Sequence, residues 1–135
     1  MPLNQPPTAI ELRYASGMAA TISLSDRARD RMAVRFRALG EPTRLKILER
    51  LFRSPASVSE ILAAVGSTQA NVSKHLAVLR AGGLVRARKA ANRTVYRIAD
   101  PSLERLCAVV CDAVKKEAHE AVAEITAAGP RSRRR

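Results

Sequence analysis

Aromatic side chains are scarce in this sequence: two Phe, two Tyr and no Trp make up 3% of its 135 residues. A protein that holds single-stranded nucleic acid by stacking its bases needs several exposed aromatic rings, so we exclude that class. Apolar residues still account for 47% of the chain. The core must therefore consist of Leu, Val, Ile and Ala, which favours helices over a β-sandwich.

Several kinds of segment are missing as well. No apolar run approaches 18 residues, so the sequence predicts no membrane span. The first 24 residues lack the basic start and apolar middle of a secretory signal. There is no phosphate-binding glycine loop, metallohydrolase signature or nucleophile elbow, so we do not expect an enzyme. These absences predict a cytoplasmic protein without a membrane partner, whose two cysteines are reduced at rest.

Carboxylates are absent from the stretch between Glu60 and Asp100. Its 39 residues hold seven Lys or Arg and one of the two histidines, His75. The formal net charge of the whole chain is +12. A positive charge of this size suggests an anionic partner, either nucleic acid or an acidic membrane surface. A segment with nothing negative to repel a phosphate favours duplex DNA.

Capping residues and apolar spacing predict five main helices, each with a typical start and stop signal. They run from Ser25 to Gly40, from Glu41-Pro42 to Ser54-Pro55, from Ser57 to Gly66, from Ser67 or Thr68 to Gly82-Gly83, and from Asp100-Pro101-Ser102 to Gly129-Pro130. We expect residues 1–24 to form a flexible arm with at most a short helix over residues 10–14. Residues 25–128 are expected to form one domain, and residues 129–135 a disordered basic tail.

Apolar residues on these helices repeat at three- and four-residue intervals, as in amphipathic helices. They are Met32, Phe36 and Leu39; Leu45, Leu48 and Phe52; Ile61, Leu62 and Val65; Val72, Leu76 and Leu79; and Leu103, Leu106, Val110, Val114, Ala121 and Ile125. The last stripe has more apolar surface than a domain of this size needs internally, which favours a dimer. An ordinary core helix is the alternative.

The third and fourth predicted helices have the spacing of a helix-turn-helix, whose second helix enters the major groove of DNA by its N-terminal end. Small residues on the exposed face of that helix let its backbone approach DNA, and Gln69, Ser73 and Lys74 can reach base edges or phosphates. His75 has either a structural role or a phosphate contact, because no second His or Cys lies near it in the sequence to bind a metal. The expected DNA contacts on this helix are Thr68, Gln69, Ala70, Asn71, Ser73, Lys74 and His75.

A β-hairpin pattern follows and supplies a basic ribbon. Two extended stretches, residues 84–90 and 94–99, surround the turn Ala91-Asn92-Arg93. Arg86 and Arg88 share one face because side chains alternate along a strand, and Arg93 at the tip could grip a phosphate or enter a minor groove. The expected DNA contacts here are Arg86, Arg88, Lys89 and Arg93. Any one of these arginines by itself could be an ordinary solvated charge.

Three runs between residues 34 and 98 resemble the ArsR/SmtB family of bacterial winged-helix repressors. They read FRALGEPTRLKILERL, VSEILAAVGSTQANVSKHLAVLRAGGLV and RARKAANRTVYRI. The resemblance implies a mainly α fold with a β-hairpin wing, and a homodimer that pairs through the first and last of its five main helices. It also implies a repressor that leaves its DNA operator on sensing a metal, a metalloid or a reactive sulfur species. The family's recognition-helix contacts correspond to Gln69, Ala70, Ser73 and Lys74. Two such heads would read a palindrome with half-sites about 34–36 Å apart.

The familiar sensor sites of this family are missing here. Its arsenic sensors often have a Cys-x-Cys pair in the third helix, which here reads VSEILAAVG without cysteine. Its zinc sensors place Asp and His ligands along the last helix, and this chain does not have that pattern. Asp100, Glu104, Asp112, His119 and Glu120 could add hard ligands for zinc, but they form no evident tetrahedral set.

The only thiols, Cys107 and Cys111, lie four residues apart on the last predicted helix. Side chains at this spacing have β-carbons about 5–6 Å apart, whereas a disulfide needs about 3.5–4.5 Å. A bridging atom fits better: a soft metalloid, a soft metal, or one or more added sulfurs. This pair is the candidate sensor and the candidate metal site, and no cofactor is required. Inert packing of two small buried side chains is the alternative.

These observations predict a homodimeric, sequence-specific repressor that binds a palindromic duplex and releases it when Cys107 and Cys111 react with a thiophilic inducer. Two other functions stay open. One is a DNA-binding regulator of the same fold that senses no small molecule. The other is a general nucleic-acid-binding protein, which the Arg-rich tail and the high charge would also suit.

Overall fold

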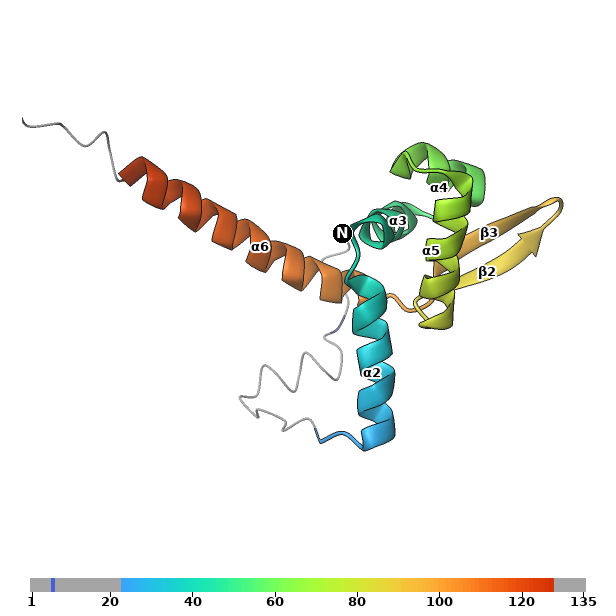
Figure 1. Cartoon of the computed structure of the whole chain (residues 1–135), viewed down its shortest axis with the longest axis horizontal. Helices are drawn as coiled ribbons and strands as arrows, with labels where there is room; N and C mark the ends of the chain where they lie inside the picture. The colour runs from blue at the N-terminus through green and yellow to red at the C-terminus, as the bar shows by residue number, and fades with distance from the viewer. Residues whose placement is uncertain (1–5, 7–22, 128–135) are drawn as a thin grey trace, which may run out of the picture. The chain divides into compact units, whose positions relative to one another are not determined.

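A computed structural model describes residue 6 and residues 23–127 (Figure 1). The predicted arm falls almost entirely outside these residues, as does the predicted tail. The helices are α2 (Asp26–Leu39), α3 (Pro42–Arg53), α4 (Val58–Val65), α5 (Gln69–Ala81) and α6 (Ser102–Ala127). The strands are β1 (Ala56–Ser57), β2 (Val85–Ala90) and β3 (Arg93–Ile98). The predicted mainly α fold with a β-hairpin is confirmed.

The predicted capping residues begin and end the helices. Glu41 caps α3 by accepting a hydrogen bond from the backbone N–H of Arg44 (2.8 Å). Ser57 caps α4 and Thr68 caps α5 through their hydroxyl groups. Gly66 ends α4 at φ 71°, a left-handed conformation that glycine adopts without steric cost. Two helices on either side of one tight turn are thus fixed by local chemistry.

The core lies between α3, α4, α5 and the sheet. Its fully buried side chains are Ile47, Leu48, Ile61, Val72, Leu76, Leu79 and Val85. Every residue predicted to face inward from α5 is among them. By elementary transfer energies, each such side chain stabilises the fold by about 1.5–3 kcal/mol relative to exposure.

The predicted buried stripe of α3 is partly wrong. Leu48 is buried and Phe52 packs at the edge of the core, but Leu45 is 44% exposed. The buried face of α3 centres instead on Ile47, Leu48 and Leu51. At 3.6 residues per turn, Leu45 lies roughly 110° around the helix from this centre, so α4 and α5 cannot cover it.

The hairpin belongs to a three-stranded antiparallel sheet in the order β1-β3-β2. In β1, Ala56 pairs with Tyr96 and Ser57 pairs with Val95. This strand was not predicted, because a segment of two residues is too short to show an alternating pattern. The turn is also shorter than predicted: Arg93 pairs with Ala90, so the strands are joined by only two residues.

The long helix α6 leaves most of its apolar side chains exposed. Leu103 is buried and Cys107 packs against the core, while the large apolar side chains farther along the helix are exposed to solvent in the single chain. The exposed large apolar residues are Leu106, Val109, Val110, Val114, Val122 and Ile125. Met32 and Phe36 of α2 are also exposed. Among the described residues, no helix combines the length and apolar character needed to cross a membrane.

Candidate nucleic-acid interface

The exposed face of α5 is held in place by its buried face. Val72, Leu76 and Leu79 have no exposed surface, and they fix the rotation of the helix about its axis. The opposite face then presents five of the predicted contact residues to solvent. These exposed residues are Thr68, Gln69, Ala70, Ser73 and Lys74. They occupy the N-terminal half of the helix, which is the half that reads bases in a helix-turn-helix.

Asn71 and His75, predicted to contact DNA, are both half-buried. The Asn71 amide donates to the hydroxyl oxygen of Ser67 (2.8 Å), so it braces the turn between α4 and α5. The short side chain of Asn71 thus folds back on the turn, and its contact with DNA stays a prediction. For His75, the structure supports the structural role among the two that were predicted.

A polar cluster around Arg44 joins α5 to α3. The guanidinium of Arg44 lies 3.2 Å from Nδ1 of His75 and donates to the carbonyl oxygens of Ala38 (2.6 Å) and Arg37 (3.2 Å). The Glu41 carboxylate lies 3.7 Å from the same His75 nitrogen. The hydrogen bond from the Arg44 backbone and, to a smaller extent, that from the Thr43 backbone lower the pKa of Glu41. The sequence gives no signal for this cluster, because its members lie up to 38 positions apart (residues 37–75).

One face of the hairpin is lined with arginine. Arg86 lies directly opposite Arg97, and the strand alternation puts Arg88 and Arg93 on the same face. All four side chains are exposed. Lys89, which pairs with Thr94, is exposed but belongs to the other face. The prediction that Arg86 and Arg88 share a face is confirmed, and Arg93 and Arg97 extend that face.

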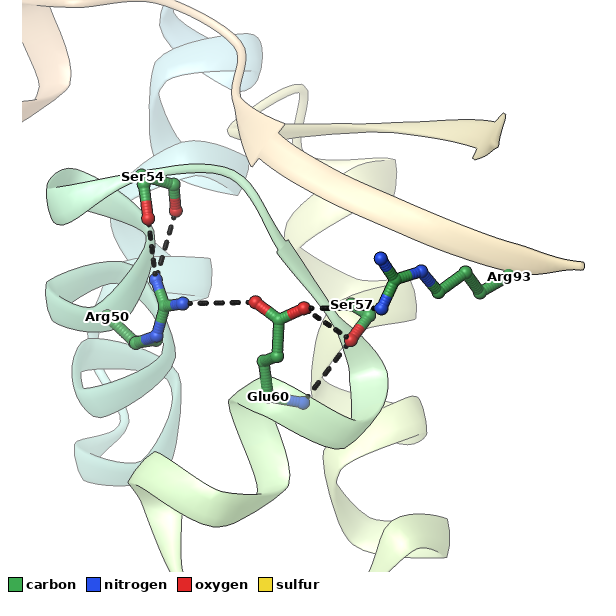
Figure 2. Close-up of polar contacts among 5 residues, drawn as sticks. All are labelled: Arg50, Ser54, Ser57, Glu60 and Arg93. Carbon is green, nitrogen blue, oxygen red and sulfur yellow. Dashed lines mark hydrogen bonds and ion pairs between the residues drawn. The ribbon is translucent and has the colours of Figure 1, made fainter. Parts of the chain in front are cut away.

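Glu60, at the edge of the carboxylate-free stretch, contacts this basic surface (Figure 2). Its carboxylate forms ion pairs with Arg50 of α3 (3.3 Å) and with Arg93 of β3 (3.6 Å). Neither Arg50 nor Glu60 was among the residues predicted for the site. Their ion pairs join segments that only the fold brings together.

The two cysteines lie one helical turn apart on α6, and neither forms a disulfide. Cys107 is half-buried against the core, and this burial raises the pKa of its thiol. Cys111 is exposed. Within the described part of the chain, no three His, Cys, Asp or Glu side chains gather closely enough to hold a metal ion. Within the described residues, a single chain therefore has two thiols that could bind a thiophilic metal or react with a thiophilic reagent, with no third metal ligand nearby.

Comparison with known proteins gives a consistent result. Residues 41–87 match the family described as "Bacterial regulatory protein, arsR family". The HTH-type transcriptional regulator Rv0081 of Mycobacterium tuberculosis is 43% identical over 75 residues, or 55% of this chain and 66% of the relative. This chain thus spans just under two thirds of that protein's length. A probable mercury resistance operon repressor of Streptomyces lividans is 35% identical over 91 residues, which are 67% of this chain and 73% of that protein.

Solved structures agree in fold. The crystal structure of M. tuberculosis Rv0081 matches with a TM-score of 0.65 and 35% identity, covering 73% of this chain and 99% of that one. The homodimeric winged helix-turn-helix DNA-binding domain of Mb0332 from Mycobacterium bovis matches with a TM-score of 0.65 and 33% identity, covering 73% and 94%. The relatives are named as regulators and not as enzymes, as the sequence predicted. On this sequence and structural similarity, the chain belongs to the arsR family of bacterial regulatory proteins and has their winged helix-turn-helix fold.

Proposed function

We propose that this protein is a homodimeric transcriptional repressor that lays α5 in the major groove of a palindromic operator. The observation that carries the proposal is the exposed N-terminal face of α5 next in sequence to a hairpin with four arginines on one face. Gln69 can form hydrogen bonds with the edge of an adenine base. Lys74 can bind the edge of a guanine base or a backbone phosphate. The arginine face would then neutralise backbone phosphates, which give affinity without sequence preference.

The exposed apolar surface of α6 supports a dimer. Val110 and Val114 are 55% and 58% exposed within the single chain, and a contiguous apolar stripe of this kind marks an interaction surface. The M. bovis relative is homodimeric. Val110→Asp should therefore shift the protein from dimer to monomer in sedimentation velocity, because the substitution would bury a charge in the dimer interface formed by α6.

Competition between two duplexes tests the function. One duplex covers the region upstream of the protein's own gene, and the other has the same length and composition in random order. We expect the first to bind at least a hundred-fold more tightly, with an affinity that falls steeply as salt rises. Equal affinity for both duplexes would instead identify a general nucleic-acid-binding protein, which the net charge of +12 also favours. We likewise infer a cytoplasmic location, because that is where a bacterial operator lies.

We also propose that the cysteines form the switch that releases DNA. Cys111 is exposed and reacts first. Burial raises the pKa of the Cys107 thiol, so Cys107 reacts second and closes the bridge. The two thiols lose their protons as they bind a soft metal or metalloid. With a persulfide donor, two donor molecules instead convert the pair to a bridging trisulfide and leave as two thiols and one hydrogen sulfide, so the second donor is the oxidant. The name of the S. lividans relative, which refers to mercury, favours a thiophilic metal.

Titration of the DNA complex with mercuric ion, arsenite or a persulfide donor tests this switch. At least one should release the wild type, while Cys107→Ser and Cys111→Ser should bind DNA normally and resist release. If none of the three reagents releases the wild type, the protein is a regulator of the same fold without a thiol switch. That result leaves the proposed DNA binding intact.

A further inference from the structure

Glu60 is the only carboxylate that forms an ion pair with an arginine of the wing among the residues that the structure describes. One of its oxygens, Oε2, accepts from Arg50 (3.3 Å). The other, Oε1, accepts from the Ser57 hydroxyl (3.1 Å) and lies 3.6 Å from Nη1 of Arg93 (Figure 2). A single side chain therefore connects α3, the start of α4 and the tip of the wing.

Two of these three partners are held firmly. Ser57 is buried. Its hydroxyl group caps α4 by accepting a hydrogen bond from the backbone N–H of Glu60 (3.4 Å), and it donates to the Glu60 carboxylate (3.1 Å). Arg50 is 18% exposed and also donates to the carbonyl and hydroxyl oxygens of Ser54. The position of the Glu60 carboxylate is thus set from within the chain, independently of the wing.

Arg93 is the weakly held partner. Its side chain is 69% exposed, its distance to the carboxylate is the longer of the two arginine pairs, and it makes no other hydrogen bond or ion pair among the described residues. Exposed ion pairs of this kind contribute little to stability. Arg93 also shares its face with Arg86 and Arg88, where phosphates would approach.

We propose that Glu60 holds Arg93 in the free protein and yields it to a phosphate when duplex DNA binds. The inference rests on the proposed function of the protein as a DNA-binding regulator. In this exchange the ion pair between Arg93 and Glu60 is lost. A charge-assisted contact between Arg93 and a phosphate replaces it and releases a counterion from the DNA. Glu60 is therefore a specificity-determining residue: it offsets the phosphate affinity of Arg93, so DNA that contacts the wing without engaging α5 binds more weakly.

Fluorescence anisotropy with the two duplexes described above tests the exchange. The variants are Glu60→Gln, Arg93→Ala, their combination, and Glu49→Gln as the matched control. Glutamine keeps the contact with Ser57, because its amide oxygen still accepts a hydrogen bond from the Ser57 hydroxyl group. Glu49 is exposed on α3 and makes no hydrogen bond or ion pair in the described part of the chain, so Glu49→Gln removes the same charge without touching the wing.

We expect Glu60→Gln to tighten binding of the random duplex by roughly two- to five-fold beyond Glu49→Gln, as the loss of one exposed ion pair would allow. Arg93→Ala should weaken binding and reduce the slope of log K against log salt by about 0.9, which corresponds to one phosphate contact. In the Arg93→Ala background, Glu60→Gln should have no more effect than Glu49→Gln has in the wild type.

Three results would overturn the exchange. One is a Glu60→Gln protein that binds no more tightly than Glu49→Gln, and another is an extra gain that persists without Arg93. The third is an Arg93→Ala protein with an unchanged salt slope, which decides the question even if Glu60→Gln fails to fold. A wild type that binds neither duplex would remove the proposed function itself, which is a distinguishable outcome.

Discussion

Arg44 and His75 are joined by a hydrogen bond of 3.2 Å between Nη1 and Nδ1, and this bond ties α3 to the helix expected to read DNA. A guanidinium only donates, so Nδ1 of His75 is the acceptor in this bond. The same guanidinium binds the carbonyl oxygens of Ala38 and Arg37 at the end of α2. One planar group thus fixes the relation between the end of α2, α3 and α5.

Removing this group should destabilise the domain. Arg44→Ala leaves the half-buried His75 nitrogen and two helix-end carbonyls without their donor, so we expect the free energy of unfolding to fall by about 2–3 kcal/mol. Urea denaturation followed by circular dichroism measures it. Lys46→Ala, an exposed change on the same helix, should stay within about 0.5 kcal/mol of the wild type. Equal effects of the two substitutions would contradict a bracing role for Arg44.

The stability of the domain should depend on the ionisation of Glu41. Its pKa is lowered from an ordinary value of 4.5, chiefly by the hydrogen bond from the Arg44 backbone. A carboxyl whose pKa is lower in the folded chain contributes stability that is complete above its unfolded pKa and is lost as pH falls through the folded value. Glu41→Gln should therefore destabilise the protein at pH 7, and the difference from the wild type should shrink toward pH 3.

Urea titrations at pH 7, 5, 4 and 3 on both proteins measure this dependence. Glu49→Gln reports the effect of losing a negative charge elsewhere on α3. A Glu41→Gln penalty that stays constant across the pH series would rule out the proposed role of the ionised cap.

Two side chains on α5 and the wing should affect DNA binding differently. Gln69→Ala should cost about 1–3 kcal/mol with the operator and little with random duplex, because a base contact carries sequence information. Arg88→Ala should weaken binding of both duplexes alike and reduce the slope of log K against log salt by about one unit, because a phosphate contact carries no sequence information. Anisotropy titrations at several salt concentrations distinguish these patterns. Reversal of the two patterns would mean that the wing, and not α5, reads the sequence.

The hairpin turn contains a strained alanine. Ala91 has φ 54°, a left-handed conformation that costs a residue with a β-carbon about 1–2 kcal/mol. Ala91→Gly should relieve part of this cost and raise the midpoint of thermal unfolding. Gly66→Ala is the opposite change. Gly66 has φ +71° and an added β-carbon meets nothing within 4 Å, so the loss of stability caused by this substitution would report backbone strain alone. Stabilisation by both changes, or by neither, would contradict the strain argument.

Local chemistry in the sequence determined where the helices begin and end. Ser57 and Thr68 cap the helices that follow them by bonding backbone groups three residues away, and Gly66 supplies a conformation that few residues adopt. These interactions span a single turn, so neighbouring residues suffice to predict them. The buried stripe of α5 follows for the same reason, because its period is that of the helix itself.

Only the tertiary structure decided which of these surfaces meet. The two-residue strand β1 exists because β3 offers it a partner, and Leu45 is exposed because of where α4 and α5 lie. Glu60 and Arg93 are 33 positions apart, yet the fold places their charges 3.6 Å from each other. The carboxylate-free stretch in the sequence identified the basic surface, but the acid that restrains this surface lies just outside that stretch. Contacts between distant segments depend on the packing of whole elements, and no local pattern of residues encodes them.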